Sequence, residues 1–151
     1  SARQRLECPT PRVALGMALR GIASAAADIS DGLLGDLGHI LERSTVGATV
    51  DTTVAIELLA AYVDLTRARS LFDQQLLQET ALRCVLGGGD DYELVFTAPV
   101  AQRAAVQGAS IASATPLTRI GKIDAEPGLR LVDAQGATVL NTFASFDHFN
   151  P

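Results

Sequence analysis

Apolar residues recur at helical spacing in several stretches of the chain. This spacing predicts helices at residues 13–23, 32–43, 57–69, 73–86 and 100–108. In the second of these, Leu37 and Leu41 lie on one apolar stripe, and we expect Asp36 to point away from it. Gly35 and Gly38 would let this helix approach a neighbouring element closely.

Other stretches have the short apolar or alternating patterns of β-strands. They are residues 24–28, 48–54, 92–98, 117–124 and 129–140, the last with a hairpin turn at 134–136. Because helices and strands are mixed rather than strictly alternating, we expect an α+β fold in which helices pack on a mixed β-sheet. We expect residues 1–11, which are polar and contain two prolines, to be a linker or expression remnant, and residues 12–151 to form one domain.

The composition narrows the range of partners. The formal net charge is -5, Lys122 is the only lysine, and the arginines are scattered, which argues against binding to nucleic acid or to an anionic membrane. No apolar run approaches the roughly 20 residues that span a bilayer. Cys8 and Cys84 are too few for a disulfide framework, so we expect a reduced, cytoplasmic protein.

Acidic residues cluster where the strand that ends at Asp28 gives way to the next helix. Either Ser30 or Asp31 could cap that helix, and the backbone N–H groups at its N-terminus favour an anion. One such side chain is enough for a cap, and Asp28 has no capping role. Two carboxylates and a hydroxyl on one turn are also the oxygen ligands that Mg²⁺ prefers. Spacing alone leaves both a helix cap and a magnesium site open.

A second acidic cluster follows the glycines at 87–89. Asp90 and Asp91 come at the expected C-terminus of a helix, where the helix macrodipole favours cations, and Glu93 follows them. A solvated turn is the ordinary explanation for such a loop. A local electrostatic cost without a local gain also indicates a functional site.

The chain lacks the patterns of several common sites. It has no G-x-x-x-x-G-K-[ST] loop, and its three successive glycines precede a strand rather than a helix, unlike a dinucleotide fingerprint. His39 and His148 are isolated, and no Ser or Cys has an evident base partner. These features argue against a nucleophilic hydrolase.

Five motifs taken together resemble one family. They are "PTPRVALG" at 9–16, "DISDGLLGDLGHI" at 28–40, "GGGDDYELVFT" at 87–97, "TRIGKI" at 118–123 and "FDHF" at 146–149. In this order they resemble the C-terminal half of bacterial thiamine-monophosphate kinases, members of the aminoimidazole ribonucleotide synthetase-like superfamily. The resemblance implies that superfamily's C-terminal-domain sandwich, within a two-domain protein that pairs as a homodimer and whose N-terminal ATP-binding domain is absent from this chain.

The resemblance also implies a reaction and a set of site residues. Kinases of this family transfer the γ-phosphoryl group of ATP to thiamine monophosphate, with Mg²⁺ as cofactor, and so make thiamine diphosphate. By position in the motifs, Asp28 and Asp31 correspond to magnesium ligands, and Asp31 is the expected catalytic residue. Ser30 corresponds to a contact with the ATP phosphates. Asp90 corresponds to a substrate contact, and Phe146 to the aromatic residue that packs on the thiamine part.

Two other interpretations stay open. The chain could come from another ATP-using enzyme of the superfamily, similar to a selenophosphate synthetase or a hydrogenase-maturation protein, although "GGDDYEL" and "DHF" favour the thiamine branch. It could also be a non-catalytic module that dimerises or binds a metabolite. We expect the 151-residue chain alone to fold but not to convert thiamine monophosphate.

Overall fold

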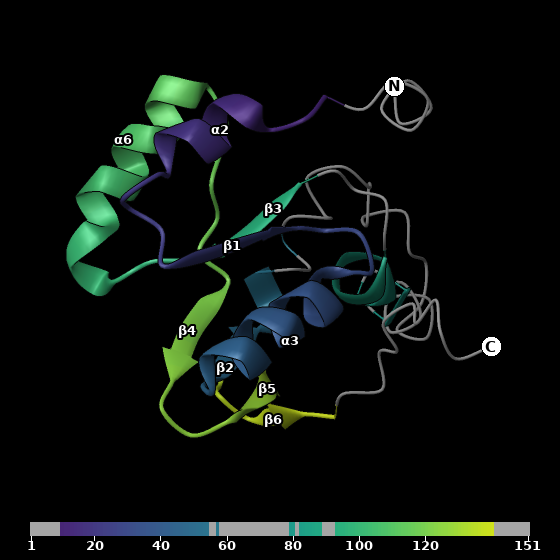
Figure 1. The fold of residues 1–151 in the computed structure, drawn as a ribbon. Coiled ribbons are helices and arrows are strands. Elements are labelled where there is room, and N and C mark those ends of the chain that lie inside the picture. Colours follow the sequence, from purple (N-terminus) through teal and green to yellow (C-terminus); the bar gives the residue numbers. More distant parts are fainter. Residues whose placement is uncertain (1–9, 55–56, 58–78, 81, 89–92, 141–151) are drawn as a thin grey trace.

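The computed structural model describes residues 10–54, 57, 79–80, 82–88 and 93–140 (Figure 1). In chain order its elements are α2 (Val13–Ala18), β1 (Ala25–Asp28), α3 (Leu33–Ser44), β2 (Gly47–Asp51), β3 (Leu94–Thr97), the 3-10 helix η2 (Val100–Gln102), α6 (Arg103–Ser113), β4 (Gly121–Asp124), β5 (Gly128–Val132) and β6 (Thr138–Val139). Residues 82–87 are also helical. The predicted helix at 57–69 lies almost entirely outside the described residues.

The strands form two sheets. β1 pairs with β3 in an antiparallel ladder in which Asp28 lies opposite Leu94. The other sheet has the order β4-β2-β5-β6, and it is mixed because β2 is parallel to β5 while its remaining pairs are antiparallel. The predicted α+β fold with a mixed sheet is therefore confirmed, with the strands divided between a ladder and a larger sheet.

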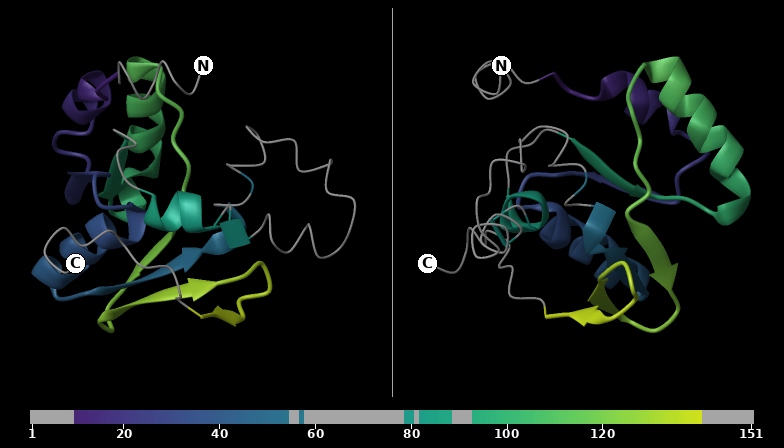
Figure 2. Two further views of the ribbon diagram at one scale, coloured as in Figure 1. Left: turned by 90° about the vertical axis from the view of Figure 1, so that its right-hand side faces the viewer. Right: turned by 180° about the vertical axis from the view of Figure 1, so that it is seen from behind.

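The two faces of the β1–β3 ladder pack against different helices. Leu94 and Phe96 join a cluster built on Leu15 of α2 and Ala109 of α6. Val95, which alternates with them along β3, joins the larger core cluster that includes α3. Figure 2 shows the result: α2 and α6 lie at one end of the molecule, and the four-stranded sheet lies at the other.

Helix α3 lies between the ladder and the four-stranded sheet. Its apolar stripe, including Leu37 and Leu41, packs with Ala48 and Val50 of β2 and with Leu131 of β5. All five side chains are at least 95% buried, so the helix is held by burial on the sheet side as well as by its contacts with the ladder. The turn that leads into α3 is consequently held by rigid elements.

Several predicted elements end at different residues. The helix predicted at 13–23 ends at Ala18; Gly21, three residues later, has a φ of 75°, which is incompatible with a helix that continues to residue 23, although Leu19, Ile22 and Ala23 still pack in the same cluster. The strand predicted at 48–54 ends at Asp51, whose carboxylate accepts a hydrogen bond from the backbone N–H of Thr53 at 2.9 Å and caps a helical turn. The helix predicted at 100–108 continues to Ser113. The hairpin predicted at 134–136 connects β5 and β6 as expected.

Candidate functional site

The turn between β1 and α3 is organised by the carboxylate of Asp36. Its Oδ2 atom accepts a hydrogen bond from the backbone N–H of Ser30 at 2.9 Å and another from that of Asp31 at 3.1 Å. Asp36 lies in the first turn of α3, where the helix macrodipole favours a negative charge, and only 6% of it is exposed. One side chain thus fixes two consecutive backbone groups of the predicted site.

This arrangement corrects one expectation and decides one open alternative. Asp36 was expected to point away from the buried stripe of its helix, but it is buried, because its hydrogen bonds and the helix N-terminus offset the cost of burial. Of the two alternatives left open for Ser30 and Asp31, a cap made by either side chain is excluded, because the N-cap residue is Gly32 and no side-chain capping bond is formed. Since the N–H groups of Ser30 and Asp31 are donated to Asp36, they are not open to a bound phosphate.

The oxygen atoms predicted to bind metal and phosphate lie on the outer side of this turn. Asp28 and Ser30 are exposed, Asp31 is half-buried, and the Ser30 hydroxyl donates a long hydrogen bond of 3.4 Å to Oδ1 of Asp31. Carboxylate and hydroxyl oxygens are the hard donors that suit Mg²⁺, so the residues present fit the ion. Within the described residues no three His, Cys, Asp or Glu side chains are close enough to hold a metal, so this turn offers part of a ligand set.

The β1–β3 ladder brings the second acidic motif to this turn. The backbone N–H of Ile29 donates to the carbonyl of Glu93 at 2.9 Å, one residue beyond the pair of Asp28 and Leu94. On the other side, Gly32 lies so close to Gly87 that a Cβ added to Gly32 would be 2.9 Å from the Gly87 carbonyl carbon and oxygen. The turn between β1 and α3 therefore contacts the second acidic motif both before and after residues 89–92.

Two predicted site residues lie outside the described part of the chain. Asp90 is one of residues 89–92, and Phe146 is one of residues 141–151. Their roles stay predictions. Of the same motif, the described residues Gly87 and Glu93 contact the turn between β1 and α3.

Glu93 has a partner that the sequence analysis missed. Arg12 donates from Nε to Oε2 of Glu93 at 2.8 Å and from Nη2 to Oε1 at 2.6 Å, so the two side chains form a bidentate pair. About a third or less of each side chain is exposed, at 27% and 33%. The pair compensates one of the clustered acidic charges and ties the residue before α2 to the second acidic motif. Its two members occur in separate motifs, "PTPRVALG" and "GGGDDYELVFT", which was the available signal.

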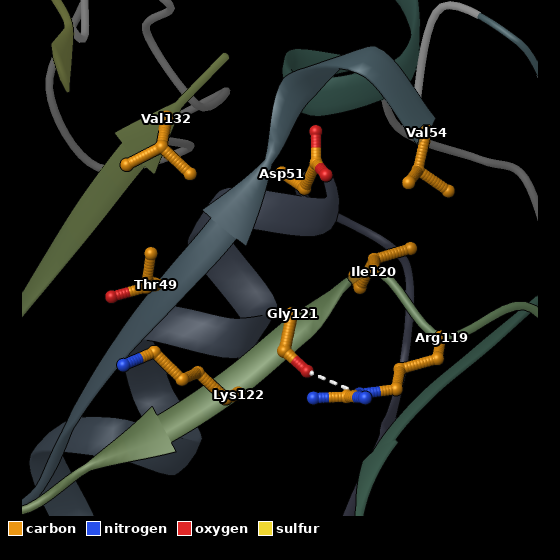
Figure 3. Close-up of a pocket in the computed structure, with 8 residues that line it drawn as sticks. All are labelled: Thr49, Asp51, Val54, Arg119, Ile120, Gly121, Lys122 and Val132. Atoms are coloured by element: carbon orange, nitrogen blue, oxygen red, sulfur yellow. Dashed lines mark hydrogen bonds between the residues drawn. The ribbon is translucent and has the colours of Figure 1, made fainter. Parts of the chain in front are cut away.

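A hollow of about 310 Å³ lies elsewhere, on the face of the four-stranded sheet opposite α3 (Figure 3). Its lining residues are Thr49, Asp51, Val54, Arg119, Ile120, Gly121, Lys122 and Val132. It contains none of the predicted site residues. Its lining combines a carboxylate with two cations, which does not match the acidic chemistry of the turn.

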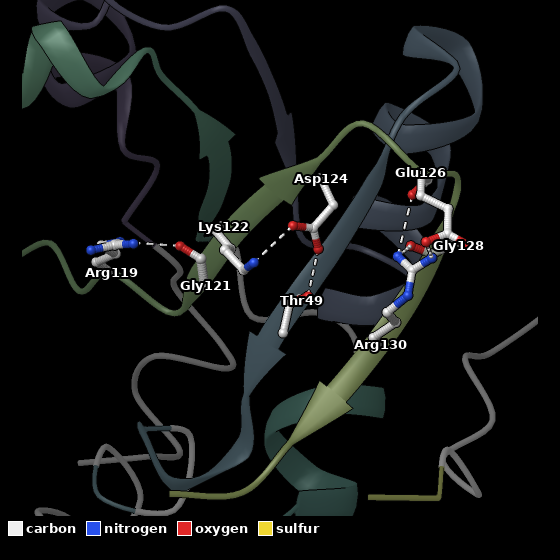
Figure 4. A network of polar contacts seen from close by, with 8 residues as sticks. All are labelled: Thr49, Arg119, Gly121, Lys122, Asp124, Glu126, Gly128 and Arg130. Atoms are coloured by element: carbon white, nitrogen blue, oxygen red, sulfur yellow. Dashed lines mark hydrogen bonds and ion pairs between the residues drawn. The ribbon is translucent and has the colours of Figure 1, made fainter. Parts of the chain in front are cut away.

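The polar side chains of this sheet face contact one another (Figure 4). Lys122 Nζ is 3.0 Å from Oδ1 of Asp124, and the Thr49 hydroxyl donates to Oδ2 of the same carboxylate. The Thr49 hydrogen bond, with help from Lys122, holds the pKa of Asp124 below its ordinary value. The guanidinium of Arg119 donates to the carbonyl of Gly121 at 3.1 Å. We attribute this network to stabilisation of the sheet.

Among the residues that the structure describes, no helix is both long enough and apolar enough to cross a bilayer.

The fold and the acidic turn correspond to a known class of protein. Residues 4–134 match the family described as AIR synthase related protein, C-terminal domain, and the chain belongs to that family. It is 42% identical over 147 residues to the thiamine-monophosphate kinase of Salmonella typhimurium, covering 97% of this chain and 42% of that protein. It is 39% identical over 142 residues to the thiamine-monophosphate kinase of Escherichia coli strain K12, covering 93% of this chain and 40% of that protein.

A solved structure gives the same result. The crystal structure of thiamine-monophosphate kinase from Stenotrophomonas maltophilia K279a is 44% identical in sequence, with a TM-score of 0.66 over 85% of this chain and 37% of that one. The resemblance stated from the motifs is thus confirmed. The chain spans about two fifths of the length of the curated relatives named here, at 42% and 40%.

Proposed function

We propose that this chain is the C-terminal domain of a kinase that transfers the γ-phosphoryl group of ATP to thiamine monophosphate and so makes thiamine diphosphate. The proposal is supported by the identity to thiamine-monophosphate kinases over nearly the whole chain. The structural observation that carries it is the contact between the two acidic motifs, through Ile29 and Glu93 on one side and Gly32 and Gly87 on the other.

Each predicted residue has a role in this proposal. Asp28 and Asp31 would hold Mg²⁺ through their carboxylate oxygens, and the Ser30 hydroxyl between them would contact the ATP phosphates. Asp90, which follows the glycines of the second acidic motif, would contact thiamine monophosphate. Phe146 would pack on the thiamine part of the substrate.

The reaction needs little help with proton transfer, but it needs neutralisation of the negative charges on its two substrates. The accepting oxygen belongs to a phosphate that is already ionised near neutral pH, so no strong general base is needed. The main obstacle is the repulsion between two polyanions that must align. Mg²⁺, when bound, would supply the charge neutralisation that a chain with one lysine lacks. Asp31 would hold its carboxylate in a fixed orientation, because its backbone is fixed by Asp36.

The proposal extends to the rest of the protein. The relatives are more than twice as long as this chain, so we propose that an N-terminal domain supplies further contacts to ATP. We also propose that the complete kinase is a cytoplasmic homodimer, and that the 151-residue chain alone is inactive.

The test is a kinase assay on the complete protein in which this chain occurs. We expect thiamine diphosphate to form from ATP and thiamine monophosphate with Mg²⁺, and formation to stop when EDTA is added. Asp31→Asn should lower kcat by about 100-fold or more, a typical cost for losing a transition-state stabiliser. Asp133→Asn is the control, because it makes the same chemical change at an aspartate outside the predicted site, one that accepts backbone hydrogen bonds from Gln135 and Ala137 in the β5–β6 hairpin.

Three results would contradict the proposal. The absence of thiamine diphosphate would favour another enzyme of the superfamily or a non-catalytic module. Turnover that is indifferent to EDTA would refute the role of Mg²⁺. An Asp31→Asn variant with the kcat of the Asp133→Asn control would remove Asp31 from the site.

A further inference from the structure

Asp36 is the one buried carboxylate among the residues that the structure describes. Within that part of the chain it forms no ion pair with a lysine or arginine. Its hydrogen-bond donors are the backbone N–H groups of Ser30 and Asp31. A carboxylate in this position carries a cost of burial, and a cap made by an exposed serine would satisfy the helix without it. This cost calls for a role beyond capping.

The position of Asp36 has two consequences for the turn. It fixes the backbone of Ser30 and Asp31, from which the predicted phosphate and metal contacts project. It also places a negative charge inside the first turn of α3, where a helix N-terminus would otherwise attract a phosphate. Together with Ile29, whose N–H is donated to Glu93, three consecutive amides of the turn are held by protein acceptors.

We propose that Asp36 is a positioning residue that makes this turn a site for a cation rather than for a bare phosphate. Its carboxylate orients the metal-binding side of the turn and repels anions that arrive without a metal. ATP is therefore admitted only together with Mg²⁺. The inference rests on the proposed function and deepens it, because it assigns the metal requirement for nucleotide binding to one residue outside the predicted ligand set.

The proposal predicts that the effect of the substitution on ATP binding differs with and without Mg²⁺, which a merely structural role would not produce. Replacing Asp36 with Asn keeps a hydrogen-bond acceptor but removes the charge. We expect Asp36→Asn to weaken ATP binding in the presence of Mg²⁺ by about 10-fold, and Asp36→Ala by up to about 100-fold, the range for residues that orient metal ligands. In EDTA we expect the affinity of Asp36→Asn for ATP to be equal to that of the wild type or higher, because the repulsion is reduced.

The experiment is calorimetric titration of the complete protein with ATP, once with Mg²⁺ and once with EDTA. Asp133→Asn is the matched control, and we expect its affinities to stay within about two-fold of the wild type, as for most surface substitutions. A second measurement needs neither metal nor nucleotide. Amide hydrogen exchange should be faster at Ser30 and Asp31 in Asp36→Ala, while the amides of Gln135 and Ala137 keep the wild-type rate.

The outcomes separate the inference from the proposed function. A wild-type protein whose affinity for ATP does not depend on Mg²⁺ overturns the proposed function and the inference with it. If the wild type needs Mg²⁺ but Asp36→Asn behaves like Asp133→Asn, the inference alone is overturned. Equal weakening of ATP binding with and without Mg²⁺ would also overturn it, since that result indicates general damage to the fold. If Asp36→Ala does not fold, Asp36→Asn still decides the question.

Discussion

Gly32→Ala is expected to destabilise the protein strongly, although it adds one methyl group. Gly32 precedes α3 with φ 105° and ψ 150°, a region of the backbone map that is essentially restricted to glycine. A Cβ there would lie 2.9 Å from the carbonyl carbon and oxygen of Gly87 and 3.1 Å from its Cα atom. Because these are backbone atoms, they cannot move aside by a change of rotamer.

The magnitude follows from these two costs. An alanine in such a conformation costs about 1–3 kcal/mol, and relief of the contact with Gly87 adds to it. We therefore expect the free energy of unfolding to fall by about 2–4 kcal/mol, a large part of the stability of an ordinary domain. Any backbone shift that lowers this cost would move the start of α3 away from Gly87, and so alter the contact between the two acidic motifs.

The assay is equilibrium unfolding in urea, followed by circular dichroism. Gly38→Ala is the control, because it makes the same chemical change inside α3, six residues further along the chain. A Cβ at Gly38 would meet nothing within 4 Å, and exchange of glycine for alanine inside a helix stabilises by roughly 0.5–1 kcal/mol. The two substitutions should therefore change stability in opposite directions. If Gly32→Ala were as stable as the wild type, the close packing of Gly32 on Gly87 would be refuted.

Three further predictions concern other contacts. Arg12 and Glu93 can be replaced with Ala singly and together, and urea unfolding of the variants should give a coupling free energy of about 1 kcal/mol, above that of most exposed ion pairs. Complete additivity of the two substitutions would show that the bidentate pair does not stabilise the fold. Because folding lowers the pKa of Asp124, its ionised carboxylate stabilises the fold at pH values above its ordinary pKa of 3.8. This contribution is lost as the pH falls through the lower pKa of the folded state. The stability advantage of the wild type over Thr49→Val should thus shrink in acid, and a difference independent of pH would contradict the role of the Thr49 hydroxyl. In the complete kinase, Phe146→Ala should mainly raise KM for thiamine monophosphate, whereas a change in KM for ATP alone would point to another pocket.

Local sequence patterns were sufficient to predict the helices and strands that are buried on one face. The stripe of α3, with Leu37 and Leu41, and the apolar strand around Val95 were predicted close to their observed bounds, because burial on one face imposes a regular spacing. The ends were less predictable. The positive φ of Gly21 prevents α2 from continuing to residue 23, and the Asp51 carboxylate caps a helical turn directly after β2. Neither feature changes the apolar spacing.

In the candidate site, too, some features were predictable from local sequence and others were not. The turn with Asp28, Ser30 and Asp31 was predicted, because unusual chemistry at a strand-to-helix junction is visible locally. The burial of Asp36 was not, since a carboxylate on a helix is normally exposed and its two backbone partners come from a bend that spacing does not specify. The pair of Arg12 and Glu93 joins residues 81 positions apart, which no local pattern reports.

The ladder between β1 and β3 has a consequence for how this family tolerates changes in length. Four residue pairs align the two strands, so the separation of the acidic motifs in space is set by the alignment and not by the number of residues between them. Natural insertions and deletions should therefore accumulate between residues 54 and 82, where they leave this alignment intact. An insertion or deletion within 25–36 or 93–97 would shift one acidic motif relative to the other, so we expect natural sequences to lack such changes.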